Sequence, residues 1–200
     1  KLYNDKKYYE EESKKMKRIY LDNAATTPLS EEVIDAMVSV MKETFGNPSS
    51  THSIGQEAKV LIENVRRQVA DYLHVSPAEI IFTSCGTESN NMIIKSCVEN
   101  LGVERIITSP MEHKCVAETV LDMKKNRGTE VTFLRPNQKG DFDLSKLEEL
   151  LKSSDKKTLV TLMHANNEIG NLIDLKKVAE ICKENNALFH SDTVQSMAHM

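Results

Sequence analysis

The 200-residue sequence has no tryptophan, only four cysteines and no uninterrupted apolar run longer than three residues. A membrane-spanning helix needs about 20 predominantly apolar residues in succession, so none is predicted. Four cysteines without a C-x-x-C pair do not form a disulfide scaffold in a chain of this length, and we expect a reducing compartment, the cytoplasm. The net charge of −4 argues against general binding to nucleic acid or anionic lipid.

The composition that remains is typical of a folded protein with a charged beginning. Hydrophobic residues make up 40% of the chain and charged residues 28%, too apolar for a disordered chain. Residues 1–18, KLYNDKKYYEEESKKMKR, lack the apolar stretch of a signal peptide. We expect them to be a charged leader, although KKMKR could also be a small basic targeting patch. Residues 19–200 are expected to form one domain.

Short β-branched segments alternate with segments of helical period from residue 19 onward. The predicted strands are Ile19–Leu21, Ile80–Thr83, Arg105–Ser109, Val131–Leu134, Leu159–Met163 and Leu188–Ser191. The predicted helices are Ser30–Met41, Glu57–Leu73, Thr87–Leu101, Lys114–Asn126, Leu144–Leu151 and Leu175–Asn185. Strands joined through helices indicate βαβ crossovers. We therefore predict an α/β fold with a mostly parallel sheet and helices on both faces.

An open α/β sheet binds its ligand beyond the carboxyl ends of its strands, so those segments carry the candidate site. The first is SCGTESNN at residues 84–91, which leads into a predicted helix. Gly86 allows close approach of the backbone, Thr87 can add a hydroxyl donor, and the helix N-terminus favours a phosphate. The alternative is a capping box with Thr87 as its cap. A P-loop is excluded because the G-K-[ST] tail is missing.

Two further strand ends carry His113 and the HANNEIG segment. His113 stands at a junction between loop and helix, where a histidine is either a polar surface residue or a functional one. The adjacent asparagines of HANNEIG, of which Asn167 is the second, suit a tight turn as well as they suit ligand contact.

The last strand end is HSDTVQS, in which Asp192 follows an apolar strand. A carboxylate there is costly unless a cation or a strong donor accompanies it. His190, Asp192 and His113 could be arranged around a metal ion, but no spacing enforces this and we expect no metal site. A phosphate cradle, a histidine, amides and a buried carboxylate together suit a phosphorylated heteroaromatic cofactor. The carboxylate would keep a ring nitrogen protonated.

Six motifs resemble a known family when they are taken together. YLDNAATTPLSEEV, FGNPSSTHSIGQEA, FTSCGTESNN, MEHK, HANNEIG and HSDTVQS occur in the order and approximate spacing of the cysteine desulfurases. These are pyridoxal-phosphate enzymes of the class V aminotransferase group, fold type I. The resemblance covers about residues 16–200 and implies the large cofactor-binding domain of that fold. No single motif would be specific.

The resemblance implies a role for each matching residue toward pyridoxal 5′-phosphate. Gly86 and Thr87 match the contacts to the cofactor phosphate. His113 matches the histidine that stacks on the pyridine ring and assists proton transfer, which makes it the implied catalytic residue.

Three further matches surround the ring. Asn167 matches the amide near the cofactor hydroxyl and the substrate carboxylate. Asp192 matches the carboxylate on the pyridine nitrogen, and Gln195 matches the amide at the phenolic oxygen.

Two residues that the family requires have no match in these 200 residues. One is the lysine that binds the cofactor covalently in a Ser-x-His-Lys context, and the other is the cysteine that becomes a persulfide. Cys115 is better explained as a partly buried structural thiol. We therefore expect the sequence to be the N-terminal half of a longer enzyme, with an incomplete large domain, and to be inactive alone.

The function implied by the resemblance is removal of sulfur from L-cysteine, giving alanine and an enzyme persulfide. The enzyme would be a homodimer that passes sulfur to an acceptor, such as an iron–sulfur scaffold protein. Within the enzyme class, the alternatives are a selenocysteine lyase or another class V enzyme. Outside it, they are a truncated paralogue that acts as a binding module and a doubly wound domain for some other phosphate ligand.

Overall fold

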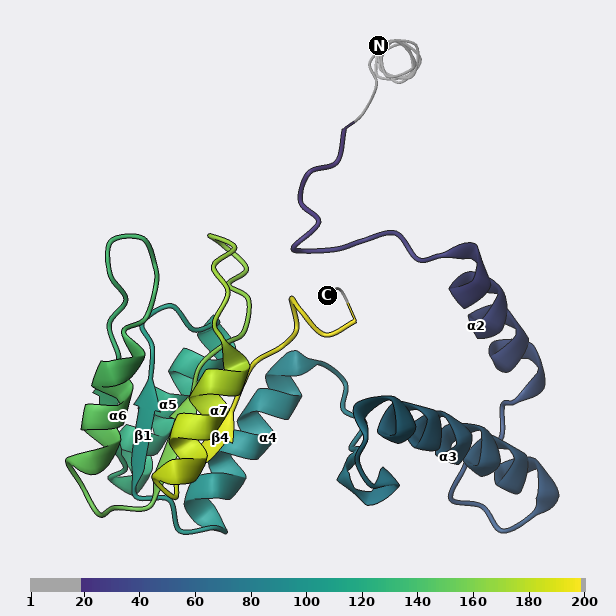
Figure 1. Ribbon diagram of the computed structural model, residues 1–200. Helices are drawn as coiled ribbons and strands as arrows, with labels where there is room; N and C mark the ends of the chain where they lie inside the picture. The colour runs from purple at the N-terminus through teal and green to yellow at the C-terminus, as the bar shows by residue number, and fades with distance from the viewer. Residues whose placement is uncertain (1–18, 199–200) are drawn as a thin grey trace, which may run out of the picture. The chain divides into compact units, whose positions relative to one another are not determined.

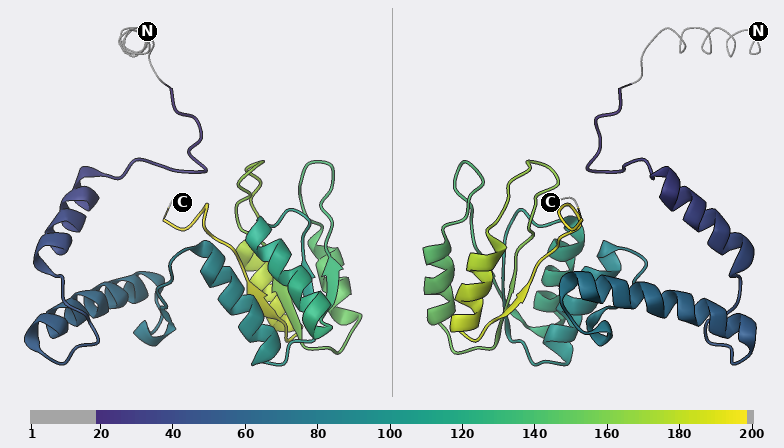
Figure 2. Two further views of the ribbon diagram at one scale, coloured as in Figure 1. Left: turned by 180° about the vertical axis from the view of Figure 1, so that it is seen from behind. Right: turned by 45° about the vertical axis from the view of Figure 1, so that its right-hand side comes forward.

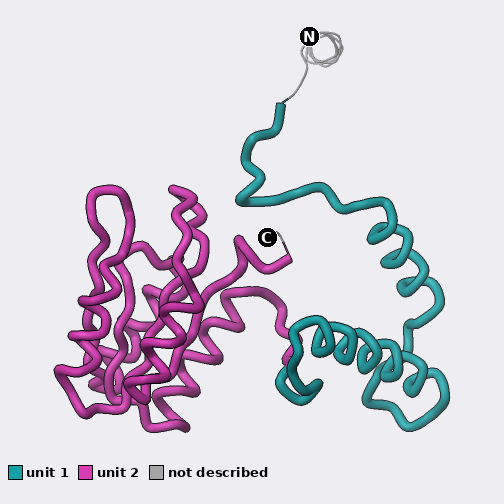
Figure 3. Tube along the Cα trace, in the orientation of Figure 1, with its two compact units in different colours: residues 1–79 teal, residues 80–200 magenta. Residues whose placement is uncertain are grey.

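The computed structural model describes residues 19–198 and divides the chain into two compact units, residues 1–79 and 80–200 (Figures 1 and 3). The leader expected at residues 1–18 lies outside the described residues. No helix within residues 19–198 is both long and apolar enough to cross a bilayer.

The first unit contains the helices α2 (Glu31–Glu43) and α3 (Ser53–Leu73) and the short 3₁₀ helix η1 (Pro77–Glu79). Ser30 caps α2 as its position suggests, because its hydroxyl accepts a hydrogen bond from the N–H of Val33 at 3.4 Å.

Two predictions for this unit are wrong. α3 begins four residues before Glu57, because Nδ1 of His52 accepts from the N–H of Gly55 at 3.3 Å and serves as the cap. Histidine is not among the usual N-cap residues, so the sequence did not mark this start. Ile19–Leu21 forms no strand, and its two aliphatic side chains are largely exposed. A strand exists only through pairing with a neighbour, and none of the strands in the described chain pairs with this segment.

The second unit is built on a four-stranded parallel sheet with the order β2-β1-β3-β4. The strands are β1 (Arg105–Thr108), β2 (Glu130–Phe133), β3 (Thr158–Thr161) and β4 (Leu188–His190). The helices are α4 (Gly86–Glu99), α5 (Lys114–Arg127), α6 (Leu144–Lys152) and α7 (Leu175–Glu184). Asp143 caps α6, Asp174 caps α7, and Gly128 ends α5 in the left-handed conformation.

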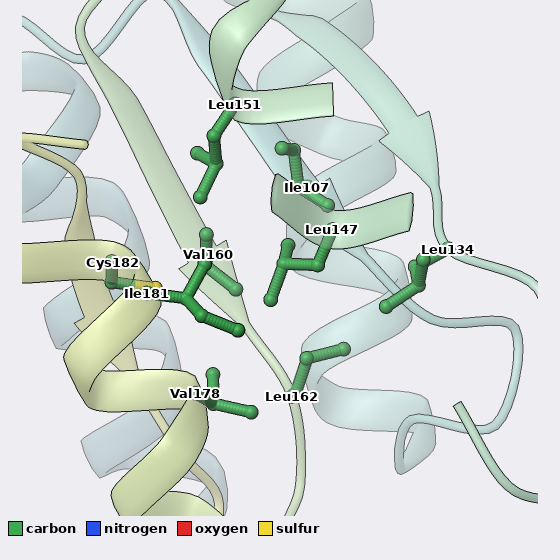
Figure 4. Close-up of a cluster of buried hydrophobic side chains, with 9 residues drawn as sticks. All are labelled: Ile107, Leu134, Leu147, Leu151, Val160, Leu162, Val178, Ile181 and Cys182. Atoms are coloured by element: carbon green, nitrogen blue, oxygen red, sulfur yellow. The ribbon is translucent and has the colours of Figure 1, made fainter. Parts of the chain in front are cut away.

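Helices cover both faces of this sheet (Figures 1 and 2). Successive strand residues alternate between two buried clusters: Ile106 packs with the cluster that includes side chains of α4 and α5, and Ile107 packs with side chains of α6 and α7. Figure 4 shows the second cluster, in which Val160 of β3 faces Leu147 and Val178. The prediction of a parallel α/β sheet with helices on both faces is therefore confirmed.

Ile80–Thr83 was predicted as a strand and lies outside this sheet, which is a second correction to the strand assignment. Ile81 is 61% exposed and Phe82 is 50% exposed. The apolar, β-branched composition favours an extended backbone, but composition alone does not determine which segments join the sheet. The edges of the four-stranded sheet are β2 and β4.

The strand order reverses between β1 and β3. The chain passes from β1 through α5 to β2 on one side, and then returns to place β3 on the other side of β1. The carboxyl ends of β1 and β3 therefore flank a topological switch point, the place where open α/β sheets bind ligands.

Candidate active site

The N-terminus of α4 offers backbone N–H groups to an anion. Cys85 occupies the N-cap position without a side-chain capping bond, and Thr87 lies in the first turn. The alternative in which Thr87 is the cap of a capping box is therefore wrong. The backbone N–H of Glu88 lies against the exposed Cys85 thiol and, with Ser84 and Thr87, lowers its pKa. Negative charge is thus stabilised at this helix end, as a phosphate cradle requires.

Gly86, the first residue of α4, is a glycine for a packing reason. A Cβ atom at this position would lie 2.7 Å from Cγ2 of Val194. Val194 belongs to the segment after β4, so the missing side chain lets that segment approach the start of α4. Gly86 and Asp192 consequently line the same hollow.

Asp192 is buried, 6% exposed, directly after β4. Its Oδ2 accepts from Nδ2 of Asn90 at 2.8 Å, and its Oδ1 accepts from the N–H of Val194 at 3.0 Å. Within residues 19–198 no lysine or arginine forms an ion pair with it. Both donors are neutral, so they orient the carboxylate without neutralising it. A buried carboxylate in this state fits a cationic partner.

His190, the last residue of β4, is joined to Asp192 through Asn90. Its Nε2 lies 3.1 Å from Oδ1 of Asn90, and its Nδ1 lies 2.8 Å from Oγ1 of Thr161 on β3. The Asn90 oxygen can only accept, so we assign the imidazole proton to Nε2. Burial lowers the pKa of His190, while the charge of Asp192 opposes the shift. The ring is therefore neutral near pH 7.

His113 stands at the N-cap of α5 and is exposed. Its Nδ1 accepts from the backbone N–H of Cys115 at 3.2 Å and lies 3.0 Å from Sγ of the same residue. Because this nitrogen accepts from a backbone donor, the thiol also donates to it and the ring proton lies on Nε2. His113 and Thr87 line one cleft with residues of α4 and α5.

The two adjacent asparagines of HANNEIG have different environments. Asn166 is buried, and its Oδ1 accepts from the N–H groups of Glu168 and Ile169 at 2.9 and 3.0 Å. Its Nδ2 donates to the carbonyl of Met111 at 2.8 Å, which ties the segment after β3 to the segment after β1. Asn166 therefore fulfils the turn role, as its residue type suggests. Asn167 is half-buried, donates to Oε1 of Glu168 at 3.0 Å and lines neither of the two hollows just described.

Gln195 is half-buried in the turn that follows Asp192. This turn is fastened to the end of β3 through His164, whose N–H donates to the carbonyl of Asp192 at 2.9 Å. Nδ1 of His164 also lies 2.8 Å from Oγ of Ser196. The fold thus brings Gly86 close to Asp192 and Thr87 close to His113. Asn167 and Gln195 lie on two separate segments, each beyond the carboxyl end of a strand.

Glu112 is a buried carboxyl group at the switch point that the sequence analysis missed. It is 8% exposed, and its Oε1 accepts from Oγ of Ser109 at 2.7 Å and from the N–H of Met163 at 3.1 Å. Burial raises the pKa of Glu112 to about 7, and the charge of Asp192 adds to the rise while these hydrogen bonds oppose it. Glu112 therefore links the ends of β1 and β3 immediately before His113.

Three polar side-chain atoms in the described chain are buried without a partner at this edge of the sheet: Oγ1 of Thr108, Oε2 of Glu112 and Oγ of Ser191. Buried polar atoms normally have a hydrogen-bond partner. Three atoms without one at the strand ends are typical of a binding region. Asn90 and Glu112 were the residues missed by sequence reasoning. A polar residue on the buried face of a helix was the only available signal for Asn90, and an acid beside a strand end was the signal for Glu112.

Comparison with known proteins gives consistent matches. The family profile described as aminotransferase class-V matches residues 19–200. The chain is 44% identical over 188 residues to the cysteine desulfurase IscS of Dictyoglomus turgidum, covering 92% of this chain and 47% of that protein. It is 42% identical over 181 residues to the mitochondrial cysteine desulfurase of Saccharomyces cerevisiae, covering 89% of this chain and 36% of the relative.

Solved structures show the same fold. A NifS-like protein superposes with a TM-score of 0.84 at 40% identity, covering 90% of this chain and 50% of the other. A structure described as SspA in complex with cysteine has a TM-score of 0.80 at 33% identity, covering 87% and 50%. The chain thus spans about half the length of the curated relatives that it matches.

Proposed function

The chain belongs to the class-V aminotransferase family, and on that premise we propose that its parent protein is a cysteine desulfurase. By parent protein we mean the polypeptide that continues this chain to the length of its relatives. The substrate would be L-cysteine, and the products alanine and an enzyme-bound persulfide. The observation that carries the proposal is the buried Asp192, held by two neutral donors beside the start of α4.

Pyridoxal 5′-phosphate fits the residues at this edge of the sheet. The helix end at Gly86 and Thr87 stabilises negative charge and would hold the phosphate. Asp192 is a buried carboxylate whose described partners leave its charge uncompensated, which suits a protonated ring nitrogen. When bound, this cofactor acts as an electron sink that stabilises a carbanion at the substrate α-carbon.

The remaining proposed contacts come from three segments. His113 would cover the ring, with its proton on Nε2 and its Nδ1 occupied by Cys115. Asn167 would contact the cofactor hydroxyl and the substrate carboxylate, and Gln195 the phenolic oxygen. These assignments follow the resemblance, and each residue lies on a segment beyond the carboxyl end of a strand, where the fold binds ligands.

We assign two catalytic roles to this chain: assistance of proton transfer, and stabilisation of the positive charge on the protonated ring nitrogen. His113 would assist proton transfer as the resemblance implies. With Nδ1 accepting from the Cys115 backbone, its Nε2–H is available as a hydrogen-bond donor to the reacting group. Asp192 would keep the ring nitrogen protonated, because an adjacent carboxylate favours the cation. Neutral His190 and the Asn90 amide complete the buried surroundings of that carboxylate.

The partners of the parent protein follow from the same proposal. We propose a homodimer that transfers sulfur to an acceptor, such as an iron–sulfur scaffold protein. All four cysteines of this chain are free, which agrees with a reducing compartment. We propose the cytoplasm for this protein, although two of its relatives are named for mitochondria and mitosomes.

The direct test is to supply the purified parent protein with pyridoxal phosphate and measure alanine from L-cysteine and from L-selenocysteine. Cysteine-dependent alanine with equimolar sulfide after addition of a thiol reductant supports the proposal. Alanine from selenocysteine alone would instead identify a selenocysteine lyase. Binding of cofactor without product from either amino acid would indicate a binding module.

A further inference from the structure

Asn90 occupies the centre of a buried array that joins two parts of the site. It lies on α4 and is 4% exposed. Its Nδ2 lies 2.8 Å from Oδ2 of Asp192 and 3.3 Å from Sγ of Cys115, and its Oδ1 lies 3.1 Å from Nε2 of His190. An amide nitrogen has two protons to donate, so both of its contacts can form together.

The orientation of this amide is fixed by its neighbours. If nitrogen and oxygen were exchanged, the Asn90 carbonyl would face the Asp192 carboxylate, and two acceptors would meet in a buried site. With the nitrogen toward Asp192, every contact pairs a donor with an acceptor. The chain runs from the Thr161 hydroxyl through His190 and Asn90 to Asp192, and all of its donors point toward the carboxylate.

The second branch of the array reaches His113. Asn90 donates one N–H to the sulfur of Cys115, and the Cys115 thiol donates to Nδ1 of His113. Nδ1 cannot donate to the sulfur, because it already accepts from the Cys115 backbone. Cys115 is therefore a neutral hydrogen-bonding link in this geometry and not a thiolate nucleophile.

We propose that Asn90 is the positioning residue that holds Asp192 directly and His113 through Cys115 in one hydrogen-bonded array. This proposal rests on the proposed function, in which Asp192 and His113 contact the cofactor ring. The array itself is formed by side chains between Asn90 and Asp192. Removing the Asn90 amide leaves Asp192 with the Val194 N–H as its remaining described donor and deprives His190 of its acceptor.

The experiment compares the parent protein with Asn90→Ala, Cys115→Ala and Cys115→Ser, and with Asn126→Ala as a control. Asn126 is an exposed amide near the end of α5, hydrogen-bonded to Asp122. For Asn90→Ala we expect kcat for alanine formation to fall by about tenfold to a hundredfold, the effect of losing one hydrogen bond to a charged group, with KM changed by less than about threefold.

Cys115 gives a second test, because it is the link between Asn90 and His113. Serine keeps a donor toward His113, so Cys115→Ser should retain activity within about threefold, whereas Cys115→Ala should lose more. Asn126→Ala should match the parent in all measurements. Equal kcat values for the parent and Asn90→Ala would overturn the proposal.

A readout independent of catalysis separates this proposal from the proposed function. Nitrogen-15 NMR of the cofactor-free parent protein reports which imidazole nitrogen carries the proton. We expect the Nε2–H form at His190 and His113, and a mixture of both forms at His190 in Asn90→Ala. An unchanged His190 signal in Asn90→Ala would overturn the array. A parent protein that shows the expected tautomers but forms no alanine would refute the function and leave the array standing.

Discussion

At the switch point between β1 and β3, the free energy of local opening should fall as the pH rises. Replacing Glu112 with glutamine should remove this pH dependence. Burial raises the pKa of Glu112 from 4.5 to about 7. Between these values the folded state binds more protons than the opened state, so the free energy of opening falls as the pH rises and becomes constant above about pH 7. One pKa unit corresponds to about 1.4 kcal/mol, and integration from pH 5 to pH 8 gives a loss on the order of 2 to 3 kcal/mol. Glutamine keeps an oxygen for Ser109 and Met163 and has no charge to bury.

The assay is amide hydrogen exchange of the parent protein and of Glu112→Gln, followed at the peptide that contains Met163. This amide donates to Glu112, so its exchange reports opening of that bond. Taking the ratio of the two proteins at each pH removes the intrinsic pH dependence of exchange. The protection of the variant relative to the parent should rise by roughly thirtyfold to a hundredfold between pH 5 and pH 8, the fold-change equivalent of about 2 to 3 kcal/mol.

A matched control is Glu118→Gln, the same substitution at an exposed acid of α5. Its protection ratio should stay constant with pH. If the ratio for Glu112→Gln were also constant from pH 5 to pH 8, Glu112 would titrate near its ordinary value, and the argument from burial would be refuted.

Two further predictions concern the phosphate cradle and the extent of the chain. Gly86→Ala in the parent protein places a methyl group against Val194, where a Cβ lies 2.7 Å from Cγ2, so pyridoxal phosphate should bind about tenfold more weakly in a fluorescence titration. Adding Val194→Ala should restore most of the affinity, and a double variant as weak as the single one would contradict the packing argument. The 200 residues alone should release no sulfide from cysteine above a pyridoxal-phosphate blank, because no residue matches the required lysine and cysteine. Turnover by the purified chain would refute this.

The parallel sheet could be predicted from the sequence because its signals are local. The strands β1 to β4 begin and end within two residues of their predicted bounds. The strand predicted at Ile80–Thr83 is not part of the sheet, because a local pattern does not encode which segments pair with one another. The predicted start of α3 at Glu57 was wrong because the helix is capped by His52, a residue type that rarely serves as an N-cap.

The site was predictable where it follows strand ends and unpredictable where it depends on tertiary contact. His113 and Asp192 lie on the segments that follow the carboxyl ends of β1 and β4, and a general rule of α/β sheets identifies such segments. Asn90 contacts Asp192 across 102 positions and Cys115 across 25, and no sequence spacing encodes either contact. Glu112 has the same difficulty, because its burial results from the approach of β3 to β1.

The central claim is that Asp192 pairs with the ring nitrogen of pyridoxal phosphate, and one variant tests it most directly. Asp192→Asn in the parent protein keeps the shape of the side chain and removes its charge. Bound cofactor and alanine formation from L-cysteine should be measured on the same sample. We predict that alanine formation falls at least about a hundredfold, equivalent to about 2.7 kcal/mol of barrier, while most of the cofactor is retained through the cradle at Gly86 and Thr87. Turnover within a fewfold of the parent would contradict the claim.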